Sequence, residues 1–333
     1  MRIRTRASIG FMGLLLLALI ATMRAGQAKT PKPVLVVLDK GDSELAIVNP
    51  GTLTVVGRVK TGPMPHEVAV SEDGRIAVAT NYGEHQAGTT LSVIDLDSQR
   101  EIHRVELKDL SGPHGVQFFD GKAWFTAEGA KKIARYDPAT DRVDWTHEIG
   151  QDRTHMLVIA RDGHTIYTSN VNSNTVTAVV ANAERSQWTN TVIPVGKGPE
   201  GIDLSPDGLE VWAANSGDGT VSIIDTSTKQ VKQVVNVGTK HSNRVKFTPD
   251  GKRALISDIA TGDLLVVEVS ARTLNKRVKL GSSAEGILMV PDGSRAFVAV
   301  SGDNKVAIVD LKTLEVTKTF VTGKDPDGMA WGE

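Results

Sequence analysis

The sequence predicts an all-β fold, a single seven-bladed β-propeller of four-stranded antiparallel blades, and three observations carry that prediction. A short motif, in which a loop leads into one strand and a turn containing Asp-Gly, recurs along the chain. Its copies are 48, 41, 45, 43, 42 and 42 residues apart, a period typical of propeller blades. The apolar runs between the turns are four to eight residues long and rich in β-branched side chains, which favours strands over helices.

The copy that runs from Gly198 to Gly208 shows the pattern of one blade most clearly. Pro206-Asp207-Gly208 is a turn sequence, because proline presets one turn angle and glycine accepts the left-handed backbone. Gly217-Asp218-Gly219 also resembles part of a calcium loop, but as a hairpin turn it needs no ion. The four expected strands of this blade are Ile202–Ser205, Glu210–Ala214, Thr220–Asp225 and Gln230–Val237.

The residue just before each expected first strand defines a set of seven polar side chains, which we call the mouth ring. In a propeller the first strand of each blade lines the central channel, so we expect these side chains to converge at one mouth of the channel and to bind a ligand there. His241 is expected to add a further imidazole. The mouth ring consists of His66, His114, His155, Glu200, Asn243, Glu285 and Asp327.

The two ends of the chain are expected to share one blade. Val34–Leu38, Glu44–Val48 and Thr54–Lys60 have the pattern of three strands with no motif before them. Residues 327–331 have the pattern of a first strand with nothing after it. Pairing these segments would close the ring and leave no blade incomplete.

Residues 1–28 have the pattern of an export signal. Arg2, Arg4 and Arg6 precede an apolar run over residues 9–23, and Gly26-Gln27-Ala28 is a small-x-small cleavage site. The apolar run is shorter than the roughly 20 residues that a membrane-spanning helix needs. We therefore expect a periplasmic or secreted protein without a membrane span, and a propeller domain over residues 33–333.

The composition excludes several classes of site. The chain has no cysteine, which rules out disulfides, thiolate metal sites and a haem-attachment motif, and so leaves an electron-transfer role without support. Loss of the four arginines in residues 1–28 would leave 34 basic and 39 acidic residues, a net charge of −5. This balance disfavours nucleic-acid binding. We expect a monomer whose partner is a small molecule or an envelope protein.

The second strands carry a resemblance to a known family. Ile76–Asn81, Ile166–Asn170 and Val211–Asn215 resemble the tyrosine-valine-threonine-asparagine (YVTN) repeat, which follows a Ser-Pro-Asp-Gly turn and precedes a Val-Ile-Asp strand. The mature chain is similar to the YVTN-repeat, YncE-like propellers of the quinoprotein amine dehydrogenase-like superfamily. The resemblance implies a seven-bladed propeller. The family includes archaeal surface-layer proteins and exported proteins, so it implies no single activity.

One blade also resembles a second family. Gly112–Val116, Ala123–Glu128 and Lys132–Pro138 are similar to a repeat of the streptogramin (virginiamycin B) lyases. Those enzymes draw metal ligands and a catalytic histidine from several blades, whereas this chain shows the pattern in one blade.

The mouth ring leaves two main functions open. The first is an exported binding scaffold of the cell envelope. The alternative is a metal-dependent lyase or lactonase, with His114 and His155 as catalytic candidates. Imidazole and carboxylate ligands suit a divalent ion such as Zn²⁺, Mn²⁺ or Fe²⁺, with Mg²⁺ or Ca²⁺ also considered. The candidate ligands are His66, His114, His155 and Glu200. A ring that is polar only because it faces channel water remains the simplest interpretation.

Overall fold

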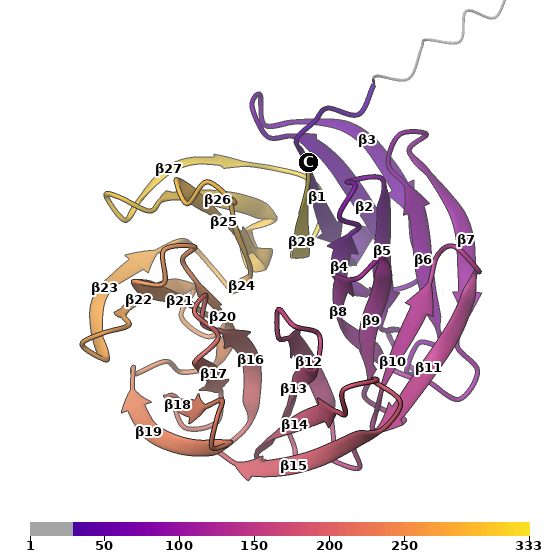
Figure 1. Ribbon diagram of the computed structural model, residues 1–333. Coiled ribbons are helices and arrows are strands. Elements are labelled where there is room, and N and C mark those ends of the chain that lie inside the picture. The colour runs from indigo at the N-terminus through magenta and orange to yellow at the C-terminus, as the bar shows by residue number, and fades with distance from the viewer. Residues whose placement is uncertain (1–28) are drawn as a thin grey trace, which may run out of the picture.

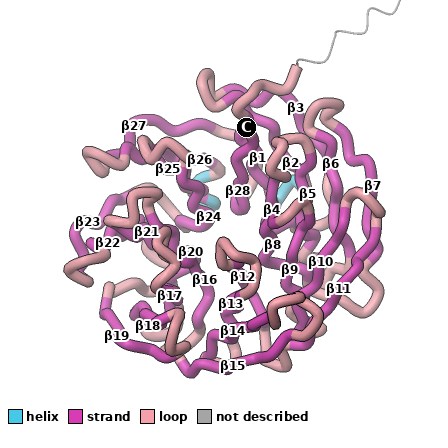
Figure 2. Tube along the Cα trace, in the orientation of Figure 1, coloured by secondary structure: helices cyan, strands magenta, loops and turns pink. Residues whose placement is uncertain are grey.

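The computed structural model describes residues 29–333, so the predicted leader lies outside the described residues. Within them, strands β1 to β28 form seven four-stranded sheets around a central axis (Figure 1). Two single turns of 3-10 helix, η1 (Lys40–Asp42) and η2 (Ser301–Asp303), are the helical segments of this part of the chain (Figure 2). The prediction of an all-β, seven-bladed propeller is confirmed.

Six of the described blades each use four consecutive strands paired antiparallel. They are β4 (Pro65–Val70), β5 (Ile76–Asn81), β6 (Thr90–Asp95) and β7 (Arg100–Glu106); β8 (Pro113–Phe119), β9 (Lys122–Ala127), β10 (Lys132–Asp137) and β11 (Arg142–Glu148); β12 (Thr154–Ile159), β13 (Thr165–Asn170), β14 (Thr175–Ala181) and β15 (Trp188–Pro194); β16 (Pro199–Leu204), β17 (Glu210–Asn215), β18 (Thr220–Asp225) and β19 (Gln230–Asn236); β20 (Ser242–Phe247), β21 (Arg253–Asp258), β22 (Asp263–Glu268) and β23 (Thr273–Lys279); β24 (Ala284–Met289), β25 (Arg295–Val300), β26 (Lys305–Asp310) and β27 (Glu315–Phe320).

The remaining blade joins the two ends of the chain, as the sequence predicts. Its strand order is β28 (Pro326–Gly332), β1 (Val34–Asp39), β2 (Glu44–Asn49) and β3 (Thr54–Lys60). Strand β28 pairs antiparallel with β1, so that Leu35 lies opposite Trp331. Because this pairing links the first and last described strands, ring closure depends on hydrogen bonds between the two ends of the chain.

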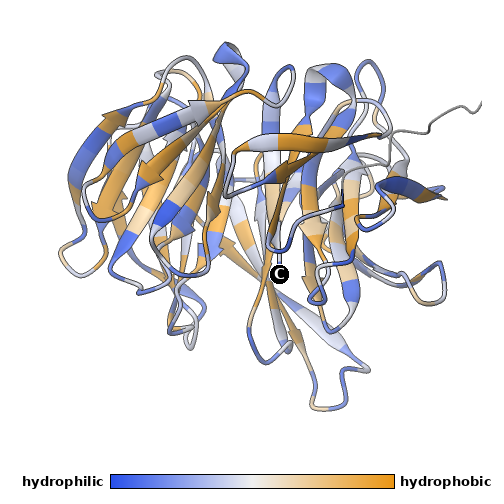
Figure 3. Cartoon of the chain, turned by 90° about the horizontal axis from the view of Figure 1, so that it is seen from above, coloured by the Kyte–Doolittle hydropathy of each residue, from blue (hydrophilic) through white to orange (hydrophobic). Residues whose placement is uncertain are grey.

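The core lies between the faces of neighbouring blades. Hydrophobic residues recur along the strands, as the colours in Figure 3 show, and buried apolar side chains of neighbouring sheets pack in common clusters. Leu264 of β22 and Val298 of β25 come from adjacent blades and are both fully buried in one cluster. Full burial of such a side chain contributes about 1.5–3 kcal/mol to the hydrophobic stabilisation. No helix in residues 29–333 is long and apolar enough to cross a membrane.

The innermost strands carry a β-bulge close to where they begin. Strands β28, β4, β8, β12, β16, β20 and β24 surround the axis, each in contact with the next (Figure 1). The pairing register of all seven shifts near the mouth-ring residue, for example between Pro199 and Gly201 of β16. The expected strand beginning at Ile202 was therefore too short, because the bulge interrupts the apolar alternation. Each mouth-ring residue is the second residue of its strand.

Hydroxyl groups of the second strands satisfy the backbone at three of these bulges. Thr126 of β9 accepts a hydrogen bond from the Gly115 N–H at 2.9 Å and donates one to the His155 carbonyl at 2.6 Å. Ser169 makes the same pair of contacts one blade further on, and Thr80 makes it one blade earlier. One buried hydroxyl therefore fixes the bulge of its own blade and the mouth-ring residue of the next.

The asparagine of the YVTN repeat has a structural role. Asn170 ends β13, where its amide donates hydrogen bonds to Thr175 and Thr177 at 3.1 and 3.0 Å and its oxygen accepts one from Thr154 at 3.1 Å. These bonds tie three strands of one blade together beneath the mouth. The asparagine of the repeat is therefore explained by the stability of the blade and not by the chemistry of the site.

Replacing Thr126 with Val should lower the free energy of unfolding by about 2–4 kcal/mol, because valine keeps the shape but leaves a buried N–H and a buried carbonyl without partners. Urea unfolding of both proteins measures the change. The matched control is Thr191→Val, since Thr191 is an exposed residue of β15. Equal, small effects of both substitutions would contradict the role given to the hydroxyl.

Candidate functional site

The mouth-ring residues gather at one end of the channel, and most of them contact one another. His66 Nδ1 lies 3.1 Å from His114 Nε2, and the rings of His114 and His155 are 3.8 Å apart between centroids. His155 Nε2 lies 3.7 Å from Glu200 Oε1, and His66 Nδ1 lies 3.8 Å from Asp327 Oδ2. The structure thus brings together an unbroken series of these residues across five blades.

Asn243 and Glu285 occupy their expected positions but take part differently. Asn243 is buried, and its Oδ1 has no hydrogen-bond partner. Glu285 contacts Lys40, whose Nζ lies 2.5 Å from Glu285 Oε2 and 3.3 Å from Asp327 Oδ2. Lys40 therefore joins the last two members of the ring by a cation that the sequence did not place here.

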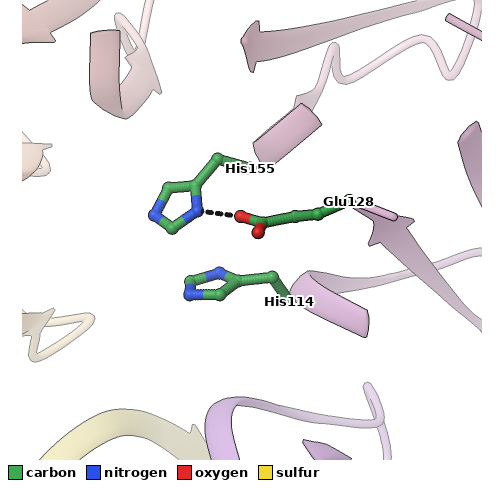
Figure 4. A group of neighbouring side chains, drawn as sticks. All are labelled: His114, Glu128 and His155. Atoms are coloured by element: carbon green, nitrogen blue, oxygen red, sulfur yellow. Dashed lines mark hydrogen bonds and ion pairs between the residues drawn. The ribbon is translucent and has the colours of Figure 1, made fainter. Parts of the chain in front are cut away.

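The centre of the site is a group of three side chains: His114, His155 and Glu128. Figure 4 shows the Glu128 carboxylate directed at His155, with His114 beside both. Glu128 accepts a hydrogen bond from His155 Nδ1 through one oxygen and from the Tyr82 hydroxyl at 2.7 Å through the other. One potential ligand atom from each of the three residues lies within 4.8 Å of the others. This group could hold a metal ion.

Two imidazole nitrogens at this centre are buried without a partner, His114 Nδ1 and His155 Nε2. Leaving a buried polar atom unpaired costs about 1–3 kcal/mol, so such atoms are rare in native proteins and call for a ligand, an ion or an ordered water. The unpaired nitrogens are the observation that makes the residues fit a cation.

The protonation states also suit a cation. Burial lowers the pKa of His114 well below its usual value, and His155 and His66 nearby lower it further, so the imidazole is neutral. Burial raises the pKa of Glu128, but the hydrogen bonds from His155 and Tyr82 outweigh it, so the net shift is downward and the carboxyl is ionised. Neutral imidazole and ionised carboxylate are the forms that bind metals, and two histidines with one carboxylate suit Zn²⁺ or Fe²⁺.

Glu128 was not among the residues that sequence analysis selected. It follows β9 directly, whereas the mouth ring was chosen from the first strands alone. A periodic signal for its position exists, because the residues that follow the second strand of each blade are 42 to 46 positions apart. These residues are Lys40, Tyr82, Glu128, Val171, Ser216, Ile259 and Ser301. His66 and Glu200, which the sequence suggested as ligands, lie next to the group of three.

His241 and Arg153 lie on the solvent side of the site. His241 Nε2 is 3.2 Å from Glu200 Oε2, and this hydrogen bond raises the pKa of His241. Arg153 Nε is 3.7 Å from Glu128 Oε1. The side chains of His241, Arg153 and His66 are 51%, 40% and 20% exposed, so these three are accessible from solvent.

An ion pair closes the channel behind the ring. Arg244, the residue after Asn243, contacts Glu67, the residue after His66, although the two come from blades that are not neighbours. Four other blades have glycine at this position, and at Gly286 a Cβ would lie 2.2 Å from the Asp327 carbonyl oxygen. Glycine thus lets the inner strands approach, while Glu67 and Arg244 fill the axis. A cavity of about 240 Å³ follows beyond them.

Comparisons with known proteins agree with the fold. The family model described as "Lactonase, 7-bladed beta-propeller" matches residues 123–331. The curated protein YncE of Salmonella typhimurium is 28% identical over 190 residues, which are 56% of this chain and 53% of the relative. The chain therefore spans about half the length of the curated relatives it matches. The predicted resemblance to YncE-like propellers is confirmed.

Solved structures share the architecture at low identity. A protein of unknown function from Desulfotomaculum acetoxidans has a TM-score of 0.76 at 15% identity, covering 90% of this chain and 99% of its own. A structure entitled periplasmic gluconolactonase, from Pseudomonas aeruginosa, has a TM-score of 0.74 at 15% identity, covering 90% and 99%. At this identity the similarity shows the fold alone.

Replacing Glu285 with Gln should make stability depend less on pH. Burial, together with the Asp327 carboxylate, raises the pKa of Glu285 from 4.5 to about 7 in the folded protein. Between these values the folded protein binds more protons than the unfolded chain, so this group makes stability fall as pH rises, by at most about 1.4 kcal/mol per pH unit. Urea unfolding of both proteins across this window isolates the contribution. If the free energy of unfolding of the wild type, relative to that of Glu285→Gln, increased with pH, the raised pKa of Glu285 would be contradicted.

Proposed function

Because the chain belongs to the family of seven-bladed lactonase propellers, we propose that it hydrolyses a lactone, a cyclic ester, at the channel mouth. The observation that carries the proposal is the buried group of His114, His155 and Glu128, whose two imidazoles each leave one nitrogen unpaired. Family membership favours hydrolysis over β-elimination, the other reaction that a metal and a histidine would support.

His114, His155 and Glu128 are the residues that would hold a divalent cation. Such a cation, when bound, activates water and polarises the lactone carbonyl. In the overall reaction the water oxygen bonds to the carbonyl carbon, the bond from that carbon to the ring oxygen breaks, and the ring oxygen gains a proton. The product is an open-chain hydroxy acid.

The surrounding side chains position this centre. Tyr82 holds one oxygen of Glu128, which leaves the other for His155. His66 contacts Nε2 of His114, which leaves Nδ1 as the nitrogen without a hydrogen-bond partner. Such contacts behind metal-binding side chains usually fix ring orientation, and their loss costs about 10- to 100-fold in affinity or activity. A substrate would enter past His66, Arg153 and His241.

The place of action is part of the proposal. The pattern in residues 1–28 supports export, and the Pseudomonas aeruginosa structure that shares the fold is entitled a periplasmic enzyme. We therefore place the reaction in the periplasm or outside the cell. Its partner would be a small, soluble lactone.

Binding without turnover is the second candidate function. It agrees with the exported scaffold that the mouth ring suggested, and one observation favours it. His114 and His155 are each only 2% exposed, so a substrate reaches them only if the entrance residues move. In that case the centre would hold an ion or a ligand and the ring would serve as a recognition surface.

Glu128→Gln and His155→Gln should each lower lactone hydrolysis by at least about 100-fold, since each removes a ligand and leaves the side chain's size nearly unchanged. The measurement is the rate of acid release from an aliphatic δ-lactone, with metal content determined on the same samples. Treatment with a chelator should abolish the activity, and Zn²⁺ or Mn²⁺ should restore it. His147→Gln in the outer strand β11 is the matched control.

Three outcomes separate the candidates. Metal-dependent hydrolysis lost in both variants and kept in the control supports the lactonase. Stoichiometric metal without hydrolysis, lost in the same variants, supports binding without turnover. If both variants hydrolyse the lactone as fast as the wild type, the group of His114, His155 and Glu128 takes no part in the reaction.

A further inference from the structure

The charges at the mouth indicate which lactones the site would accept. Building on the proposed lactone hydrolysis, we propose that the site selects an uncharged lactone and rejects one that carries a phosphate or a carboxylate.

Each cation in contact with the ring already has carboxylate partners. Lys40 lies within 4 Å of three of them, Glu285, Asp325 and Asp327, and its side chain is 8% exposed. Arg244 pairs with Glu67 and lies 3.7 Å from Asp327, with a side chain only 4% exposed. Arg153 lies 3.7 Å from Glu128. Lys40 and Arg244 are therefore not free to receive an anion, and the two exposed basic side chains, Arg153 and His241, each already face a carboxylate.

Carboxylates outnumber these cations. Glu128, Glu200, Asp325, Asp327 and Glu285 all lie at the mouth, and with Arg244 neutralised by Glu67 they are opposed by Lys40, Arg153 and, when it is protonated, His241. Asp325, Asp327 and Glu285 share one cation, Lys40, so this side of the mouth keeps an excess of negative charge even with a divalent ion bound at the centre. A mouth of one sign attracts cations and repels anions.

A phosphate needs donors that are not committed elsewhere. Proteins bind it through arginine, lysine or backbone N–H groups that form charge-assisted hydrogen bonds. If Lys40 turned to a phosphate, Glu285 and Asp327 would remain buried without their counter-ion, an arrangement that proteins tolerate poorly. An uncharged ring of the same size meets no such penalty. The site therefore distinguishes the two by charge.

The test compares kcat/KM for D-glucono-1,5-lactone and for its 6-phosphate at a pH of about 8, above the pKa of about 7 that burial gives Glu285, so that this carboxyl is largely ionised. We expect the uncharged lactone to be favoured by at least about tenfold, since like charges brought together at a binding site are strongly unfavourable. Raising the ionic strength should increase kcat/KM for the phosphate ester and leave that for the uncharged lactone unchanged, because salt screens the repulsion.

A pair of matched variants locates the repulsion. Asp325 is 41% exposed at the mouth, and Asp120 is 80% exposed in the turn between β8 and β9; both have a left-handed backbone, with φ of 53° and 54°. Asp325→Asn should narrow the preference for the uncharged lactone by about two- to fivefold, the effect of removing one nearby charge. Asp120→Asn should leave it unchanged.

The results decide both claims separately. A preference for the phosphate ester, or a rate for it that falls with salt, overturns the inference while hydrolysis itself stands. An equal effect of Asp325→Asn and Asp120→Asn also overturns it, because the discrimination would not arise at the mouth. If neither lactone is hydrolysed faster than by the Glu128→Gln protein, the proposed function fails and this inference fails with it.

Discussion

The β-bulge near the start of each inner strand is the feature on which the rest of the structure depends. It turns the second residue of the strand toward the axis, which regular pairing would not do at that register. A bulge leaves backbone groups out of the ladder, and they need other partners when buried. Thr80, Thr126 and Ser169 supply them, and each also holds the carbonyl of the next mouth-ring residue. The blades that carry the imidazole centre are therefore connected through buried hydroxyls.

Seven polar side chains around one axis bring charges into a space with little water. The structure balances them in two ways. On one side, Lys40 and Arg244 pair with Glu285, Asp327 and Glu67, so buried carboxylates have counter-ions. On the other, burial keeps His114 neutral, the rings of His114 and His155 lie 3.8 Å apart, and each ring has one nitrogen without a hydrogen-bond partner. The buried carboxylates of the ring thus have counter-ions within the protein, whereas two imidazole nitrogens have no hydrogen-bond partner. We therefore expect the chemistry at the imidazoles.

The fold and the site carry different information about function. Propellers of many activities share this architecture, and similarity at 15% identity shows only that. Membership of the lactonase family narrows the reaction class, while the charges of this chain's own mouth narrow the substrate. A lactonase site that binds a phosphorylated substrate would be expected to keep at least one free basic side chain at its mouth. Here Lys40 and Arg244 are buried in ion pairs, and the exposed Arg153 and His241 each face a carboxylate.

The sequence by itself determined the blades, because a strand, a turn and the next strand are local features that repeat with the blade. It predicted the shared terminal blade, and it placed β3 and β18 at their observed bounds. It also selected the seven residues that gather at the mouth. Only the tertiary structure decided which of them touch. Glu128 joins His114 and His155 because neighbouring blades bring the end of one second strand beside two first strands, and Glu67 meets Arg244 across the axis, 177 residues apart. Contacts of that kind depend on ring closure and on the bulges that aim each side chain, and neither is a property of any local stretch of sequence.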